Sequence, residues 1–170
     1  GHRCRGIFAT KSNETVDPLS AHGFVLRGAG EPVVLVAVDW CEIRNGAYER
    51  WREVLAEAAG TKPGRVLVSS LHQHDAPVAD LGAENWLARA GLAGEMLDVP
   101  WHEETLQRVA EALRESLKSP RRVTHVGSGQ GVPEQKVMGL TGGALCPLDL
   151  LTNRAGDGAL VHPRELPPRS

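Results

Sequence analysis

Apolar residues along this chain follow two patterns, one typical of buried strands and one typical of amphipathic helices. Six consecutive apolar residues occupy Val33–Val38, and a shorter apolar run occupies residues 66–68. Uninterrupted runs of this kind are typical of central strands that are covered on both faces in α/β proteins. Residues 21–27 also suit a strand, and the Gly- and Pro-containing turn at 28–32 predicts a hairpin with Val33–Val38.

Between the two apolar runs, a helical period predicts an amphipathic helix over residues 43–58. Gly60 and Pro63 follow it and are typical of a helix end. Strand, helix and strand then form a βαβ unit, in which we expect the two strands to be parallel. The predicted buried positions of this helix share three- and four-residue spacing: Ile43, Ala47, Trp51, Val54, Leu55 and Ala58.

A second strong helical pattern covers residues 98–117, with Asp98 as its expected N-terminal cap. His102 and Glu103 near its start either reach toward a site or lie in an exposed first turn, and we favour the exposed turn. A short helix is expected at 83–90, where it either flanks a site or only packs, and a further strand at 122–126, in which His125 is structural. The expected buried stripe of the long helix comprises Leu106, Val109, Ala110, Leu113 and Leu117.

These elements predict an α/β fold: a mixed sheet with a βαβ core and helices packed on it. The chain has 170 residues, which is enough for one domain with a real core. We place that domain at residues 1–136. Residues 137–170 show no clean period and end in a proline-rich stretch, so we expect an irregular tail that is disordered or not native to the domain.

The most informative chemistry lies after the apolar run 66–68, where the sequence reads Ser-Ser-Leu-His-Gln-His-Asp-Ala-Pro. If extended geometry continues, His72 and His74 share one face, and the carboxylate of Asp75 follows at once. Imidazoles are common zinc ligands, and a neighbouring carboxylate can orient a ligand or act as a base. The alternative is a pair of surface histidines bonded to water or backbone.

Asp39 follows the strand Val33–Val38 directly and has two interpretations. It either caps the next helix or lines a site where strands end. Because the carboxyl ends of parallel strands meet at one edge of a sheet, Asp39 and His72 are expected at the same edge.

Composition narrows the class of partner. The 19 basic and 21 acidic residues nearly balance, so no net field indicates nucleic acid or an anionic membrane. No apolar run approaches the roughly 18 residues of a membrane span. The three cysteines, Cys4, Cys41 and Cys146, are far apart and are expected to be small buried or free thiols. The first residue is Gly, so a signal peptide is neither seen nor excluded.

The order of hairpin, strand ending in Asp39, helix, and strand running into His72-Gln-His74 with Pro77 soon after resembles the N-terminal catalytic domain of neutral/alkaline ceramidases. The similarity extends to ceramidase-like proteins of environmental bacteria and covers roughly residues 5 to 135. The resemblance implies that His72 is a Zn²⁺ ligand and that His74 lies next to the reacting centre. It also implies hydrolysis of an N-acylated lipid such as ceramide, in a family that is often exported.

The chain departs from that family at several positions. Asp75-Ala76 stands where the well-studied ceramidases have Ser-Gly, and the family's Asn-Arg pair has no counterpart in the expected region, where Lys136 and its neighbours stand. The family's other zinc ligands lie further along a longer chain. Two hypotheses follow. The first is a zinc-dependent amidase with His72 as ligand and His74, Asp75 and Asp39 in catalysis, and the second is a non-catalytic α/β fragment with at most a weak metal site.

Overall fold

The computed structural model describes residues 3–4, 11–127, 152–154 and 158–160. The chain divides into two compact units, Gly1–Ser119 and Pro120–Ser170. The first unit contains the sheet and the helices, and each unit is described separately below.

The main sheet of the first unit has three strands in the order β1-β2-β4. Strand β1 (Ala21–Leu26) pairs antiparallel with β2 (Val33–Val38), and β2 pairs parallel with β4 (Val66–Ser70). The predicted hairpin and the predicted parallel strand pair are therefore both confirmed, and so is the α/β fold with helices packed on a mixed sheet.

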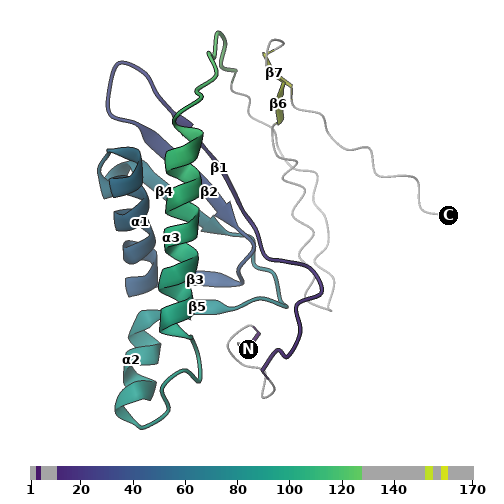
Figure 1. The fold of residues 1–170 in the computed structure, drawn as a ribbon, viewed down its shortest axis with the longest axis vertical. Coiled ribbons are helices and arrows are strands. Elements are labelled where there is room, and N and C mark those ends of the chain that lie inside the picture. The colour runs from purple at the N-terminus through teal and green to yellow at the C-terminus, as the bar shows by residue number, and fades with distance from the viewer. Residues whose placement is uncertain (1–2, 5–10, 128–151, 155–157, 161–170) are drawn as a thin grey trace, which may run out of the picture. The chain divides into compact units, whose positions relative to one another are not determined.

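Helices α1 (Gly46–Ala59) and α3 (Val99–Ser116) lie side by side against the sheet, and the shorter α2 (Leu81–Arg89) lies beyond one end of it (Figure 1). Gly60 ends α1 with a left-handed φ of 66°, a conformation that glycine adopts without a steric penalty. The side chain of Asp98 accepts a hydrogen bond from the backbone N–H of Trp101 and so caps α3 as predicted.

A second pair of parallel strands, β3 (Glu42–Arg44) and β5 (Val78–Asp80), was not predicted. It corrects the start of the first helix, because Ile43 lies in β3 and α1 begins only at Gly46. The buried Asp80 carboxylate accepts hydrogen bonds from Arg44 and from Asn45, and these bonds hold the turn between β3 and α1. Apolar spacing alone does not distinguish a buried strand residue from the first residue of a helix.

The core lies between the sheet and helices α1 and α3. Alternate residues of β2 and β4 point into it and are buried, whereas Leu67 and Phe24 are 54% and 55% exposed. Among the described residues the helices therefore cover one face of the sheet, and the cover expected on the second face is not seen. The inward strand residues are Val34, Val36, Val38, Val66 and Val68.

The strand predicted at 122–126 is wrong, because residues 121–127 form no ladder and are exposed. In that segment the Nδ1 of His125 lies 3.0 Å from the hydroxyl of its neighbour Thr124. Further along, β6 (Thr152–Arg154) and β7 (Gly158–Leu160) form an antiparallel pair. The predicted boundary at residue 136 and the rest of the predicted tail 137–170 lie outside the described residues.

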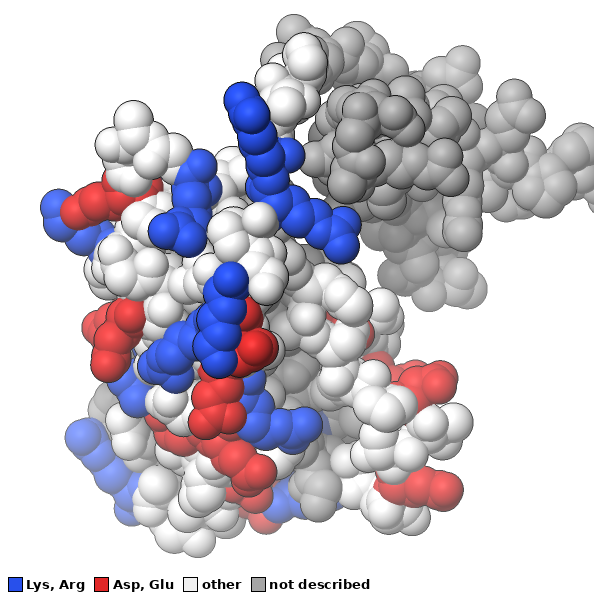
Figure 2. Space-filling view, turned by 45° about the horizontal axis from the view of Figure 1, so that its top comes forward, with Lys and Arg blue, Asp and Glu red and all other residues white. Residues whose placement is uncertain are grey.

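Charges of both signs are interspersed on the face drawn in Figure 2, in keeping with the nearly balanced composition. Within the part of the chain that the structure describes, no helix combines the length and the apolar character that a membrane crossing requires.

Candidate metal centre

The candidate site lies between two pairs of parallel strands, β2 with β4 and β3 with β5. The ladder of hydrogen bonds is interrupted between these two pairs. Three residues, 39–41, separate β2 from β3, whereas seven residues, 71–77, separate the partner strands β4 and β5. The longer segment must therefore loop out between two ladders that are both in register. Interruptions with unequal residue numbers occur often beside functional sites, because they redirect side chains away from the sheet. The His-x-His segment is the part that loops out.

Backbone hydrogen bonds fix both sides of this interruption. The N–H of Leu71 donates to the carbonyl of Val38 at 3.0 Å, and the N–H of His72 donates to the carbonyl of Trp40 at 3.1 Å. On the far side, the N–H of Cys41 donates to the carbonyl of Pro77 at 3.0 Å. The two segments are therefore held together at each end of the loop, and His72 is placed directly against the Trp40-Cys41 backbone.

His72 has a left-handed backbone, with φ of 59°. Such a conformation costs a non-glycine residue about 1–2 kcal/mol, and it ends the extended geometry of β4 at Ser70. The imidazole lies against Cys41, directly before β3, where its Nδ1 is 3.2 Å from the carbonyl oxygen of Cys41 and 3.8 Å from the Cys41 Sγ. His72 is exposed, and Cys41 is 2% exposed.

Glu42 completes a group of three potential ligands. One ligand atom from each of Cys41, Glu42 and His72 lies within 4.8 Å of the others. The Glu42 carboxylate is oriented by an ion pair of 2.7 Å with Arg44. Thiolate, carboxylate and imidazole are all zinc ligands in proteins, so this donor set fits the metal that the family resemblance implies.

His74 lies beside His72, as the sequence predicted, although a continued strand is not the reason. The two ring centroids are 5.1 Å apart and the planes are nearly perpendicular, at 78°. His74 is half-buried and Asp75 is exposed. The negative charge of Asp75 also acts on Cys4: burial, and then this charge, raise the pKa of the Cys4 thiol.

Asp39 is engaged elsewhere. Its carboxylate accepts hydrogen bonds from the backbone N–H and the hydroxyl of Ser20, at 3.0 and 2.5 Å, and its own N–H donates to the Ser20 carbonyl. It does not cap α1, whose N-terminal cap is Asn45. Asp39 therefore ties the chain entering β1 to the end of β2, and Cys41 and Glu42 are the residues of this strand end that converge with His72.

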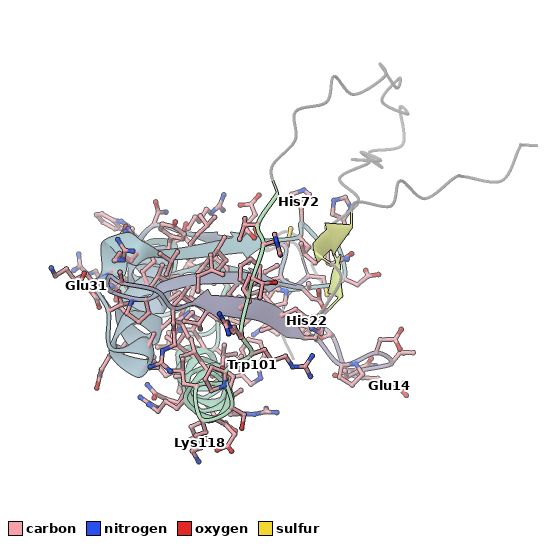
Figure 3. The ribbon with its side chains drawn as sticks, turned by 90° about the horizontal axis from the view of Figure 1, so that it is seen from above. Glu14, His22, Glu31, His72, Trp101 and Lys118 are labelled. Atoms are coloured by element: carbon pink, nitrogen blue, oxygen red, sulfur yellow. The ribbon has the colours of Figure 1, made fainter. Side chains whose placement is uncertain are left out.

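The aromatic core supports the backbone beneath the site. Trp40 stacks on Trp101 at 5.3 Å between centroids and meets Trp51 edge-on at the same distance. Figure 3 shows Trp101 and Lys118 on the α3 side of the sheet and His72 away from them. Because Trp40 is 1% exposed and packed by two indoles, the carbonyl that receives the His72 N–H is firmly placed.

His102 corrects a prediction. It was expected in an exposed first turn, yet it is fully buried against the rings of Trp40 and Trp51. Neither of its ring nitrogens makes a hydrogen bond, although Nδ1 lies 3.4 Å from a carboxylate oxygen of Glu103. Burial lowers the pKa of His102, despite the opposing influence of the neighbouring Glu103 carboxylate. His102 therefore belongs to the core and not to the metal centre.

The sequence reasoning missed Cys41 and Glu42. The available signal was the one used for Asp39, namely polar residues directly after the strand Val33–Val38. Cys41 was instead expected to be a small buried thiol, and its burial is confirmed. Which of these residues meets the loop depends on the unequal segments between the ladders, which no local pattern reveals.

No protein-family model, no curated protein and no solved structure matches this chain. The class that the structure defines is thus an α/β protein with a candidate Cys/Glu/His metal centre between two parallel ladders.

Proposed function

We propose that this chain is the metal-binding part of a zinc-dependent amidohydrolase that cleaves N-acylated, ceramide-like substrates. The observation that carries the proposal is the pair of imidazoles of His72 and His74, 5.1 Å apart in a loop that projects between two parallel ladders. The resemblance of the His-x-His segment to neutral/alkaline ceramidases supports the choice of reaction and substrate.

In this proposal His72 holds the metal from the edge of the loop. Zinc bound there would polarise the acyl carbonyl and lower the pKa of an attacking water. His74, beside His72 and only half-buried, would position or deprotonate the attacking water. Asp75 is exposed next to it and offers a carboxylate for orienting either imidazole. Asp39 keeps the opposite segment in place through Ser20.

The runner-up function is a non-catalytic α/β fragment with a weak metal site. One observation favours it: among the described residues, the only group of three or more potential ligands is Cys41, Glu42 and His72, and His72 is exposed. Zinc hydrolases commonly use three protein ligands and an open position, so the group is at the lower limit for catalysis.

The test is metal analysis of the purified full chain together with release of fatty acid from a fluorescent N-acyl sphingosine analogue. His72→Gly removes the imidazole and retains the left-handed backbone, so the fold is preserved. We expect stoichiometric zinc and amide cleavage in the wild type, and loss of both in His72→Gly. His22→Gln, which changes an exposed histidine of β1, is the matched control and retains both.

Zinc binding without any amide cleavage would favour the non-catalytic alternative. Cleavage that survives in His72→Gly would remove His72 from the mechanism.

A further inference from the structure

We infer that Cys41 is itself a metal ligand, so that Cys41, Glu42 and His72 form one thiolate-containing centre selective for thiophilic divalent cations. This inference rests on the proposed function only in that it uses His72 as a shared ligand. It adds a thiolate and a carboxylate from the segment between β2 and β3, neither of which the sequence had indicated as a ligand.

The first argument is distance. Zinc bonds to sulfur and to imidazole nitrogen are about 2.3 and 2.0–2.1 Å, so two such ligands at a tetrahedral angle lie roughly 3.6 Å apart. The Sγ of Cys41 and the Nδ1 of His72 are 3.8 Å apart. The pair is therefore spaced for coordination without movement of either backbone segment, with the metal replacing the contact between Nδ1 and the Cys41 carbonyl oxygen.

The second argument is how firmly the donors are held. The N–H of His72 is bonded to Trp40, and the N–H of Cys41 is bonded to Pro77, so both ligand backbones are pinned across the interruption. Glu42 begins β3 and is paired in register with Val78 of β5. Three ligands on hydrogen-bonded backbone need little reorganisation when a cation binds.

The third argument is the left-handed conformation of His72. An extended residue would continue along β4, whereas φ of 59° turns the imidazole toward Cys41. Strain of this kind persists where the surroundings enforce it, and it is concentrated at functional sites. Here the result is that the imidazole and the thiol, 31 residues apart in sequence, become neighbours.

The donor set determines which cations the site accepts. A soft thiolate with an imidazole favours zinc, cobalt or cadmium, whereas magnesium and calcium prefer sites made of oxygen atoms. Three protein ligands leave the fourth tetrahedral position for a water or a substrate atom. The half-buried imidazole of His74 lies next to the His72 ring, adjacent to this centre.

The experiment is a titration of the full chain with Co²⁺, read by absorption. We expect one equivalent to bind, with the visible bands of tetrahedral cobalt and a near-ultraviolet thiolate-to-cobalt charge-transfer band. Cys41→Ser is expected to abolish the charge-transfer band. Glu42→Gln is expected to retain it and to weaken cobalt binding at least tenfold. Cys4→Ser and Cys146→Ser, the matched thiol controls, are expected to retain both the band and the affinity.

Cys41 is buried, so a second measurement avoids dependence on the folding of its variant. X-ray absorption at the zinc edge of the wild type is expected to show one sulfur atom bound to the metal. A charge-transfer band that survives in Cys41→Ser, or a zinc spectrum without sulfur, would overturn the ligand set.

The two proposals fail separately. Cobalt bound without a charge-transfer band, and lost in His72→Gly, would overturn the Cys41 assignment and leave the proposed function intact. A Cys41-dependent band with no amide cleavage would overturn the hydrolase and keep the metal centre. Absence of cobalt binding in the wild type would overturn both.

Discussion

The imidazole of His102 lies 5.8 Å from the indole of Trp40, between ring centroids, in the middle of the core. Neither nitrogen of His102 is hydrogen-bonded, and nor is the indole nitrogen of Trp51. The ring centroids of Trp51 and His102 are 6.4 Å apart. A buried polar group without a partner destabilises the folded state by about 1–3 kcal/mol. The folded state therefore tolerates His102 in its neutral form and disfavours its protonation.

This burial predicts loss of stability in mild acid. Because the pKa of His102 is lowered by burial, the unfolded chain binds more protons than the folded chain between that lowered value and about pH 6.5. The free energy of unfolding should therefore fall as pH drops below about 6.5. The charged groups that influence His102 are Glu103, which favours protonation, and Arg50, which opposes it.

Replacing His102 with Phe should flatten this dependence and leave the fold unchanged or more stable. Urea unfolding at several pH values between 5 and 7.5, followed by tryptophan fluorescence, measures how the free energy of unfolding depends on pH. His125→Ala, at an exposed histidine, serves as control and should keep the wild-type slope. If the free energy of unfolding changes with pH equally in His102→Phe and in the wild type, His102 does not cause the loss of stability in acid.

Periodicity accounts for what the sequence could predict. The helices, the hairpin and the parallel pair follow from apolar spacing, which depends on neighbouring residues only. His102 carried the same signal, since it lies four residues before Leu106 on the buried stripe of α3. Its polar character led to the wrong prediction, because a histidine without a partner is seldom fully buried.

The site was predicted in part. The nearness of His72 and His74 was expected, but it arises from a left-handed turn and not from a continued strand. Cys41 and Glu42 could not be assigned, because their meeting with His72 depends on three residues facing seven between the ladders. The unequal lengths of these two segments follow from how the strands pair, and strand pairing depends on contacts between residues distant in sequence.

Glu84 is a second buried charge, and its role is to hold a loop. It is 4% exposed, and its two oxygens accept hydrogen bonds from the backbone N–H groups of Gly94, Met96 and Leu97. Glu84→Ala leaves these groups without their acceptor, and we expect a loss of about 3 kcal/mol in the free energy of unfolding. Chemical denaturation measures the loss.

Hydrogen exchange should show faster exchange of the Leu97 amide in Glu84→Ala. Glu111→Ala, an exposed position on α3, is the control and should change stability by less than about 0.5 kcal/mol. Unchanged exchange at Leu97 would contradict the role given to Glu84.

Gly23 of β1 is required by close packing against β2. A Cβ atom at this position would lie 2.3 Å from the Leu35 carbonyl oxygen and 3.0 Å from a methyl carbon of Val36. Gly23→Ala should therefore displace the hairpin and lower stability by about 1–3 kcal/mol, seen as a lower melting temperature. Gly30→Ala, in the open turn of the same hairpin, meets nothing within 4 Å and should be nearly neutral. Similar melting temperatures for both variants would argue against the close approach.

Arg50 and Glu103 join α1 to α3 through two nitrogens of the guanidinium, with the shortest bond at 2.9 Å. Both side chains are more than a third exposed, at 39% and 35%, so solvent screens the pair. A double-mutant cycle with Arg50→Ala and Glu103→Ala should give a coupling energy of about 0.5 kcal/mol.

The coupling between Arg50 and Glu103 should depend on pH. The hydrogen bond from Arg50 lowers the pKa of Glu103, so the pair stabilises the fold above the usual carboxyl range and loses its effect as pH falls through the lowered value. A coupling energy that is the same at pH 3 and pH 7 would show that the interaction is not ionic.

The looped segment between β4 and β5 has a consequence for how this protein can change. The register of β2 with β4 and the register of β3 with β5 are each fixed by their own hydrogen bonds. Insertions or deletions between Ser70 and Val78 therefore need not change either register. Length and composition can therefore vary at the one place where new side chains would face Cys41 and Glu42, and the scaffold beneath would stay as it is.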